Sequence, residues 1–388
     1  MSQSPTFDVS LERLRRIGGV KWSQYPDKIG AFVAEMDFGT AAPIADAMHD
    51  AIDLGLLGYL PEHLATRLAE AWCGFARDRY GWEVPPERVR PLADVMAGFQ
   101  SAVEHFSTPG SAVILPTPAY MPFLFVPATL GRKVIQVPMA TDEDGRSVYD
   151  LAALDAAFAA GGNLLVLCNP HNPVGRVLER SELEAVAEVV ERNGGRVFSD
   201  EIHAPLGYDG HRHVPYASVS SVSARHTVTA VSASKAWNLP GVKCAQLVLS
   251  NDTDAAVWDE VGRIPEHGAS NLGVVANIAA YEQGGPWLAQ VLEYLDGSRR
   301  LLGQLLADRI PEIGYVQPEG TYLAWLDCRA LGLGDHPAEF FLERAGVALT
   351  DGPLCGEASQ GFVRYAFATP RAIMEQTVER MAEALRNR

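Results

Sequence analysis

Short apolar runs alternate along the chain with longer segments in which apolar residues recur at helical spacing. The apolar runs predict buried strands, and they fall at residues 112–115, 133–137, 164–168, 196–199, 227–231 and 245–249. The helical spacing predicts helices between them, at residues 120–130, 151–160 and 181–193. This alternation is typical of a doubly wound α/β fold, in which a mostly parallel sheet lies between two layers of helices.

The helix predicted at 181–193 carries signals at both ends. Ser181 and Glu184 have the spacing of a capping box, and Asn193-Gly194-Gly195 is a helix stop. Since ligands of doubly wound sheets lie beyond the carboxyl ends of the strands, polar residues that follow predicted strands are the candidates for chemistry.

The pattern changes after residue 277. A long helical segment at 288–309 is followed by predicted strands at 320–326 and 363–367 and by a closing helix at 373–386. We therefore expect three parts, as the length of 388 residues allows. They are an N-terminal segment (1–40) that packs on the small domain, a large domain (41–277) and a smaller α/β C-terminal domain (278–388).

Composition and charge limit the classes of function. A net charge of −16 disfavours nucleic acid and anionic membranes as partners, and no apolar run reaches membrane-spanning length. Five widely spaced cysteines form neither a zinc motif nor a disulfide framework. With an N-terminus unlike a signal peptide, these features predict a cytoplasmic protein with free thiols.

The segment Ser232-Ala233-Ser234-Lys235 directly follows the strand predicted at 227–231. A lysine inside a pocket loses its proton by desolvation and can then form a Schiff base. The hydroxyls of Ser232 and Ser234 are suited to a phosphate, and Lys243 can add a second positive charge. The alternative is a serine-rich surface turn with solvated lysines.

The segment Asp200-Glu201-Ile202-His203 follows the strand predicted at 196–199. A buried aspartate can pair with a protonated pyridine nitrogen and keep that ring cationic, and His203 can bond near a phenolic oxygen of the same ring. The alternatives are an acidic surface loop and a metal site. We predict no metal, because no other group of His, Asp and Glu has matching spacing.

Three further turns follow predicted strands or open helices. Asn172 lies in the rigid turn at 168–175, from which its amide can reach a phenolate, and Tyr120 follows 112–115, where its ring can cover a cofactor. Val95 and Met96 open a helix whose N–H groups suit a phosphate. Taken singly, each has a structural alternative: a turn built by Asn and Pro, a core tyrosine, or an ordinary strand-to-helix turn.

In this order the parts resemble the fold-type I enzymes that depend on pyridoxal 5'-phosphate (PLP), the aspartate aminotransferase superfamily, from Trp22 to the C-terminus. Within it the chain is most similar to the MalY/PatB group of cystathionine β-lyases, also called cysteine C–S lyases. The motifs that carry the similarity are Lys21-Trp22, Tyr25-Pro26, Ala34-Glu35-Met36-Asp37-Phe38, Gly58-Tyr59, Cys168-Asn169-Pro170-His171-Asn172-Pro173-Val174-Gly175, Asp200-Glu201-Ile202-His203 and Phe367-Ala368-Thr369-Pro370-Arg371.

The resemblance implies a role for each cofactor residue. Lys235 would bind PLP covalently and act as acid and base at Cα, and Asp200 would pair with the pyridine nitrogen. Asn172, with His203, would contact the phenolic oxygen, and Tyr120 would stack on the ring. The phosphate would be held by the backbone of Val95 and Met96 and by Ser232, Ser234 and Lys243.

It also implies how substrate binds and what happens to it. Arg364 would clamp the α-carboxylate with its two-pronged guanidinium, helped by Asn172 and the backbone of Ala34. Tyr59 would be catalytic and would reach the phosphate or substrate in the partner's active site, since such relatives are homodimers with shared sites. The implied reaction cleaves L-cystathionine or a related S-substituted L-cysteine to a thiol, pyruvate and ammonia. An aminotransferase acting on an L-amino acid shares the same carbanion, and a regulator-binding protein with secondary lyase activity is a third alternative.

The chain departs from the family's motifs at three places. Glu35 replaces the first aspartate of the alanine-aspartate-methionine-aspartate-phenylalanine run, and Phe32-Val33 precedes that run where one aromatic residue is usual. Asp94 stands where glycine is common, and its charge opposes a phosphate unless the side chain turns away or caps the helix. The substrate preference therefore stays open.

Overall fold

A computed structural model describes residues 7–388, and its centre is one seven-stranded sheet. The strand order is β2-β10-β9-β8-β7-β3-β4. Neighbouring strands pair in parallel from β9 to β4, whereas β10 runs antiparallel to both of its neighbours. This confirms the predicted α/β fold. The strands are β2 (Val89–Leu92), β3 (Ala112–Thr117), β4 (Val134–Pro138), β7 (Gly162–Cys168), β8 (Arg196–Asp200), β9 (Thr227–Val231) and β10 (Ala245–Leu249).

Both faces of this sheet are buried, because side chains that alternate along each strand enter two different cores. Leu164 of β7 packs in a core with Phe99 and Phe123, whereas Leu165 packs on the opposite face with Leu183. The first core is covered by α5 (Val95–His105), α6 (Pro122–Thr129) and α10 (Asp252–Val261), and the second by α7 (Leu151–Ala159) and α8 (Arg180–Arg192).

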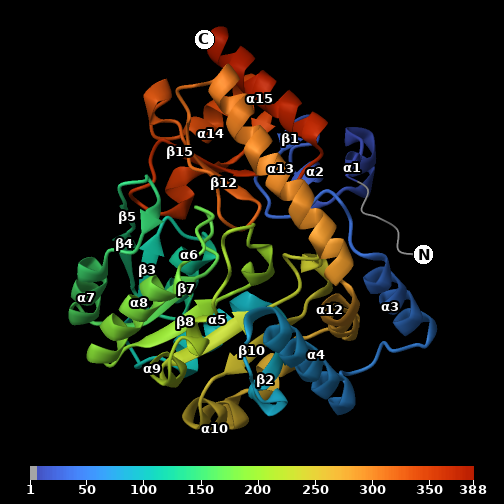
Figure 1. Cartoon of the computed structure of the whole chain (residues 1–388), viewed down its shortest axis with the longest axis vertical. Helices are drawn as coiled ribbons and strands as arrows, with labels where there is room; N and C mark the ends of the chain where they lie inside the picture. The colour runs from blue at the N-terminus through green and yellow to red at the C-terminus, as the bar shows by residue number, and fades with distance from the viewer. Residues whose placement is uncertain (1–6) are drawn as a thin grey trace.

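The small domain lies above this sheet in Figure 1, with α13 and α15 along one side. Its four-stranded sheet has the order β11-β12-β15-β14. Its elements are β11 (Gly314–Tyr315), β12 (Leu323–Asp327), α14 (Pro337–Phe340), β13 (Val347–Ala348), β14 (Thr350–Asp351) and β15 (Phe362–Ala366), with the helices α13 (Gly285–Arg309) and α15 (Arg371–Arg386).

The N-terminal segment contacts the small domain. Strand β1 (Ile29–Gly30) pairs in parallel with β13, and Phe38 lies in the core that holds Leu302 of α13 and Met374 of α15. These contacts support the placement proposed for residues 1–40, of which residues 1–6 lie outside the described part of the chain.

None of the helices in residues 7–388 combines the length and the apolar character that a bilayer crossing requires.

The remaining described elements are short or flank the sheet. These elements are α1 (Leu11–Ile17), α2 (Val20–Ser23), α3 (Ala42–Asp53), α4 (Glu62–Tyr80), β5 (Ala140–Thr141), β6 (Ser147–Val148), α9 (Ser221–Arg225), α11 (Arg263–Glu266) and α12 (Asn271–Gln283).

Two local predictions were wrong. The capping box of α8 is formed by Glu179 and Glu182, because the helix begins at Arg180, one residue before the predicted start. The strand predicted from residue 320 begins at Leu323. Thr321 has a φ of 65°, and its N–H donates to the carbonyl of Leu206 at 2.9 Å, so this residue turns away from the strand.

The predicted domain boundary after residue 277 lies inside α12. Contacts of this helix with α3 and α4 tie it to the large domain, and α13 begins directly after Gly284. We therefore place the proposed boundary at Gly284 instead.

Candidate active site

The five turns predicted from the sequence meet at one edge of the large sheet. They follow the carboxyl ends of β2, β3, β7, β8 and β9, which all point the same way. Strand β10 points the other way, and its carboxyl end is not part of this edge. The turns carry Asp94, Tyr120, Asn172, Asp200 and Lys235. This is where ligands bind in doubly wound sheets.

Lys235 lies four residues beyond the end of β9. Its Nζ donates a hydrogen bond to the carbonyl oxygen of Ala34, 2.9 Å away, so the N-terminal segment reaches into the site. Burial, with the nearby charge of Arg364, lowers the pKa of Lys235 to about 8. A substantial fraction of this amine is therefore neutral and nucleophilic near physiological pH.

Asp200 ends β8 and is buried. Its carboxylate accepts hydrogen bonds from the N–H of Ile202 at 3.1 Å and from the thiol of Cys168 at 3.8 Å. Burial raises the pKa of Asp200 to about 6, against the opposing effect of those donors and of the charge on Lys235. A buried carboxylate of this kind is stabilised in its charged form by a cation placed beside it.

The turn before α5 resolves the doubt about Asp94. Its Oδ1 caps the helix by accepting a hydrogen bond from the N–H of Ala97 at 2.9 Å, and its Oδ2 pairs with Nζ of Lys243 at 2.9 Å. Val95 and Met96 are the first residues of α5, so their N–H groups have no acceptor within the helix. The aspartate is thus compatible with an anion bound at this helix end.

The two serines of the lysine turn differ. The hydroxyl of Ser232 donates to the carbonyl of Cys244 at 2.7 Å and accepts the N–H of Ser234 at 3.0 Å. It therefore holds the turn together in this conformation. The side chain of Ser234, by contrast, makes no hydrogen bond within residues 7–388.

Arg364 lies on β15 and is buried. Its Nη1 donates to Oδ1 of Asn172 at 3.2 Å, and its Nη2 donates to the carbonyl of Phe32 at 2.7 Å and to Oγ1 of Thr350 at 3.1 Å. The small domain, the N-terminal segment and the large domain therefore meet at this one guanidinium.

His203 and Tyr322 are two further buried residues of the site. Burial, then the charge of Lys235, lowers the pKa of His203 to about 3, so the ring is neutral. Its Nδ1 is buried without a hydrogen-bond partner among the described residues. Tyr322 lies edge-on to this ring, with centroids 6.0 Å apart, and its hydroxyl donates to the carbonyl of Ala34 at 2.9 Å.

Sequence reasoning missed Tyr322 and Thr350 as parts of the site. Each lies in the small domain, far along the chain from the strand ends that they approach, so no local spacing could reveal them. For Tyr322 the available signal was a large polar-tipped residue in an apolar run, which indicates a buried hydroxyl with a partner.

Tyr120 and Tyr59 differ in how they relate to this edge. The ring of Tyr120 is half-buried and lies edge-on to Phe123 at 5.6 Å. Tyr59 is 95% exposed and borders a cavity of about 1030 Å³ lined also by Leu60 and His267. A single protomer therefore does not bring Tyr59 to the other predicted residues.

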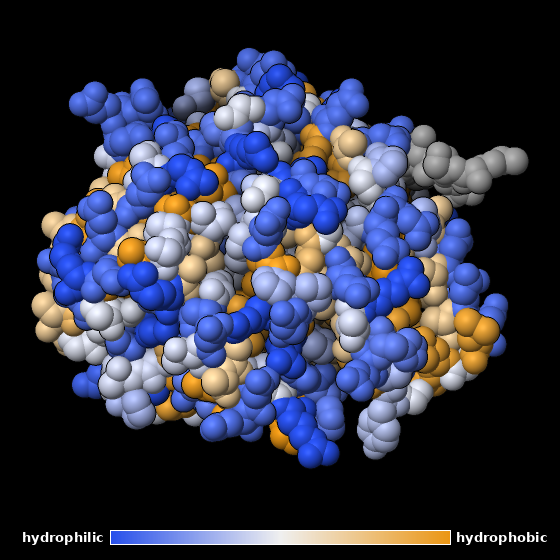
Figure 2. Space-filling view, turned by 60° about the horizontal axis from the view of Figure 1, so that its bottom comes forward, coloured by the Kyte–Doolittle hydropathy of each residue, from blue (hydrophilic) through white to orange (hydrophobic). Residues whose placement is uncertain are grey.

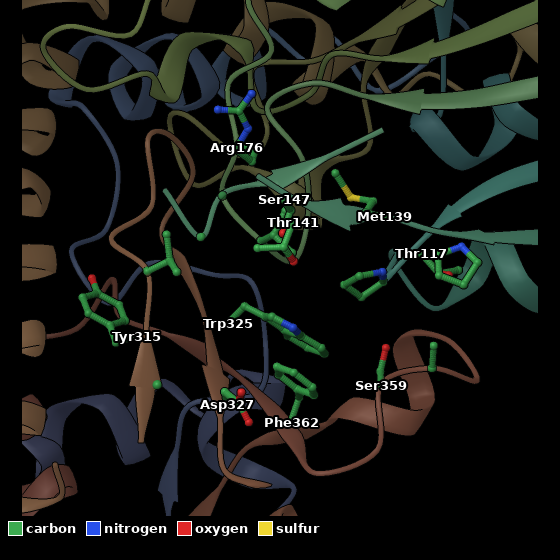
Figure 3. A pocket seen from close by; sticks show the side chains of 18 of the residues that line it. Thr117, Met139, Thr141, Ser147, Arg176, Tyr315, Trp325, Asp327, Ser359 and Phe362 are labelled. Carbon is green, nitrogen blue, oxygen red and sulfur yellow. The ribbon is translucent and has the colours of Figure 1, made fainter. Parts of the chain in front are cut away.

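A cleft of about 320 Å³ lies between the two domains and borders the turns that carry Tyr120 and Asn172 (Figure 3). Trp325 and Phe362 form its small-domain wall, with rings stacked at 5.4 Å, and Thr141 and Ser147 face them from the large domain. Trp325 pairs across the sheet with Arg364, so the two side chains lie on the same face of the small-domain sheet.

The sheet edge and its lysine, carboxylate and helix end define a class of protein. The chain belongs to the family of class I and II aminotransferases, whose sequence model matches residues 27–385. The predicted resemblance to fold-type I PLP-dependent enzymes is confirmed, as is its narrower part, the likeness to C–S lyases.

Three relatives carry that narrower likeness. The cystathionine β-lyase of Corynebacterium glutamicum is 37% identical over 97% of this chain and 99% of its own. The cystathionine β-lyase PatB of Bacillus subtilis is 31% identical over 98% and 99%. The PLP-bound C–S lyase of Staphylococcus hominis superposes with a TM-score of 0.90 at 27% identity, covering 98% of both chains.

Proposed function

We propose that this protein binds PLP covalently on Lys235 and cleaves the C–S bond of L-cystathionine or a related S-substituted L-cysteine. The products are a thiol, pyruvate and ammonia, and one water is consumed. The observation that carries the proposal is Lys235, an amine of lowered pKa whose charge interacts with the buried guanidinium of Arg364 and the buried carboxylate of Asp200.

The residues present fit the cofactor. Asp200 offers a buried carboxylate to a pyridinium nitrogen. The Nδ1 of His203, which has no partner within residues 7–388, and the amide of Asn172 offer contacts for a phenolic oxygen. The phosphate would be held by Val95, Met96, Ser234 and Lys243. Ser232 stabilises the turn that carries Ser234. Tyr120 would cover the ring.

Arg364 binds the substrate's α-carboxylate through its paired N–H donors, in place of its present contact with Asn172. This would orient the Cα–H bond toward Lys235, whose neutral amine would take the proton. When bound, PLP supplies an electron-withdrawing ring that accepts the electron pair from Cα, and Asp200 keeps that ring protonated. When the Lys235 amine has no other partner, it donates a hydrogen bond to the carbonyl oxygen of Ala34.

Elimination and transamination share this proton transfer. In elimination a sulfur leaving group on Cβ would depart, whereas transamination would require PLP to accept the proton that Lys235 holds. The relatives named as lyases at 31% and 37% identity over nearly the full chain support elimination. The match to the aminotransferase family supports the aminotransferase as the second candidate.

The experiment supplies cystathionine without any keto acid and follows pyruvate and free thiol. Steady production of both supports the lyase. A single turnover that stalls with aminated cofactor would favour the aminotransferase. If the lyase is supported, rates with cystine and other S-substituted cysteines rank the substrates.

The proposed assembly is a homodimer that shares its active sites. Leu54 and Leu57, both between α3 and α4, are 85% and 69% exposed, and both lie shortly before the exposed Tyr59 in the chain. Exposed apolar residues close together are typical of an interface, and Figure 2 shows apolar areas among polar ones on one face of the protein. Sedimentation of the protein and of Leu57→Glu tests the dimer, which the substitution should dissociate.

We also place the protein in the cytoplasm. All five cysteines are free, and four of them are buried. A reducing compartment keeps such thiols unpaired. Fractionation of cells that express a tagged chain tests the location.

A further inference from the structure

His171 belongs to a motif that the proposed cofactor contacts do not use. It lies between Pro170 and Asn172 and is 1% exposed. Its backbone closes the Asn172 turn on itself, since its N–H donates to the carbonyl of Arg176 at 2.8 Å and its carbonyl accepts the N–H of Gly175 at 2.7 Å. The imidazole points out of this turn.

The imidazole reaches the neighbouring turn, which carries Tyr120. Its Nε2 lies 2.8 Å from the carbonyl oxygen of Pro118, two residues before Tyr120. On the other side its Nδ1 lies 3.3 Å from the hydroxyl of Tyr149, just before α7. One ring therefore joins the turn of Asn172 to the turn of Tyr120.

Chemistry fixes how this ring is protonated. A carbonyl oxygen only accepts, so Nε2 carries the proton and donates to Pro118. Burial lowers the pKa of His171 and raises that of Tyr149 well above its usual range. The imidazole is therefore neutral, with Nδ1 accepting from a phenol that keeps its proton.

We propose that His171 is a positioning residue that fixes the Tyr120 ring relative to the Asn172 amide, and so the place of a pyridine ring whose face lies against Tyr120 and whose phenolic oxygen meets Asn172. This inference rests on the proposed function. The short Nε2 bond ties the two turns together, and the longer Tyr149 contact only orients the imidazole.

The test compares two amides of different reach. In His171→Gln the amide nitrogen stands near the former Nε2 and can still donate to Pro118. In His171→Asn it stands near the former Nδ1 and falls short. Tyr149→Phe is the matched control, because it removes the far hydroxyl and leaves the Pro118 bond.

For each protein the dissociation constant of PLP is measured by titrating cofactor-free protein. The pH midpoint of the bound cofactor's visible absorption, kcat and KM are measured as well. Loss of one buried hydrogen bond predicts roughly tenfold weaker PLP binding for His171→Asn. We also expect kcat to fall about tenfold with KM nearly unchanged, and the absorption midpoint to move by about half a pH unit.

His171→Gln should stay within about threefold of the unmodified protein in PLP affinity, and Tyr149→Phe within about twofold. Equal losses in His171→Gln and His171→Asn would overturn the inference. So would a fall in melting temperature with unchanged PLP affinity and midpoint, because the role would then be structural only. A Tyr149→Phe effect as large as that of His171→Asn would contradict it as well.

The same data separate this inference from the proposed function. If the unmodified protein fails to bind PLP on Lys235, the proposed function fails. If it binds PLP and releases pyruvate while His171→Asn is indistinguishable from it, only the inference about His171 fails.

Discussion

The two sides of the site are built in different ways. The cofactor side comes from turns at the ends of adjacent strands, and the large sheet alone brings Asp200 and Lys235 together. The carboxylate side is assembled from parts far apart in sequence: Arg364 bonds to the carbonyl of Phe32, 332 residues earlier. The first depends on one sheet, and the second on how three parts of the chain meet.

We infer from this difference that the two sides affect different kinetic constants. On the cofactor side Lys235 moves a proton and Asp200 keeps the ring charged, so loss of either should lower kcat. Groups on the carboxylate side make fixed hydrogen bonds to the part of the substrate that does not react, so their loss should raise KM.

Lys235→Ala removes the amine of lowered pKa. We expect kcat to fall about 10⁴-fold, because Lys235 is the group proposed to move the Cα proton, and the visible absorption of bound PLP to disappear. Steady-state kinetics and absorption spectra check this. Lys235→Arg is the control: it keeps the charge but should stay inactive, since its guanidinium remains protonated. Full activity in either variant would refute the assignment.

Asp200→Asn keeps the shape of the side chain and removes its charge. The expected loss is about 10²- to 10³-fold in kcat with KM changed little, because the amide no longer holds a pyridinium in its charged form. Asp200→Glu retains the charge and should lose less. A change confined to KM would contradict the proposed division between the two sides.

The lowered pKa of Lys235 predicts a pH dependence. Only the neutral amine attacks the aldehyde of PLP, and its fraction rises with pH until the pKa of about 8 is passed. PLP uptake by cofactor-free protein should therefore accelerate about tenfold per pH unit below pH 8 and level off above it. Stopped-flow absorption measures this, and a profile flat from pH 6 to pH 9 would contradict the lowered pKa.

Arg364→Lys keeps a positive charge but loses the two-pronged donor. KM should rise roughly 10- to 100-fold while kcat falls less, as expected for a charge-assisted hydrogen bond to the α-carboxylate. PLP affinity serves as the control and should stay the same. Weakened PLP binding would show that the two sides are not separate.

Thr350→Val removes one hydroxyl that accepts from Arg364 and keeps the side chain's shape. Since Arg364 keeps its bond to Phe32, KM should rise only about two- to tenfold. Kinetics with cystathionine measure the change. No change in KM would mean that the carbonyl of Phe32 alone orients the guanidinium.

Sequence reasoning succeeded where a residue follows a strand. Asn172, Asp200 and Lys235 were predicted because each stands just after an apolar run, and parallel strands bring their carboxyl ends to one edge. It erred at element ends, as at Thr321, where a positive φ and a bond to Leu206 stop an apolar pattern from continuing as a strand.

The sequence by itself determined the alternation of strands and helices, the sheet that follows from it, and the identity of the groups at its edge. Only the tertiary structure decided the pKa values of Lys235 and Asp200, the capping role of Asp94, and the contacts that Tyr322 and Thr350 make with the site. The physical reason is that desolvation and hydrogen bonding depend on which distant segments cover a group, and local spacing does not carry that information.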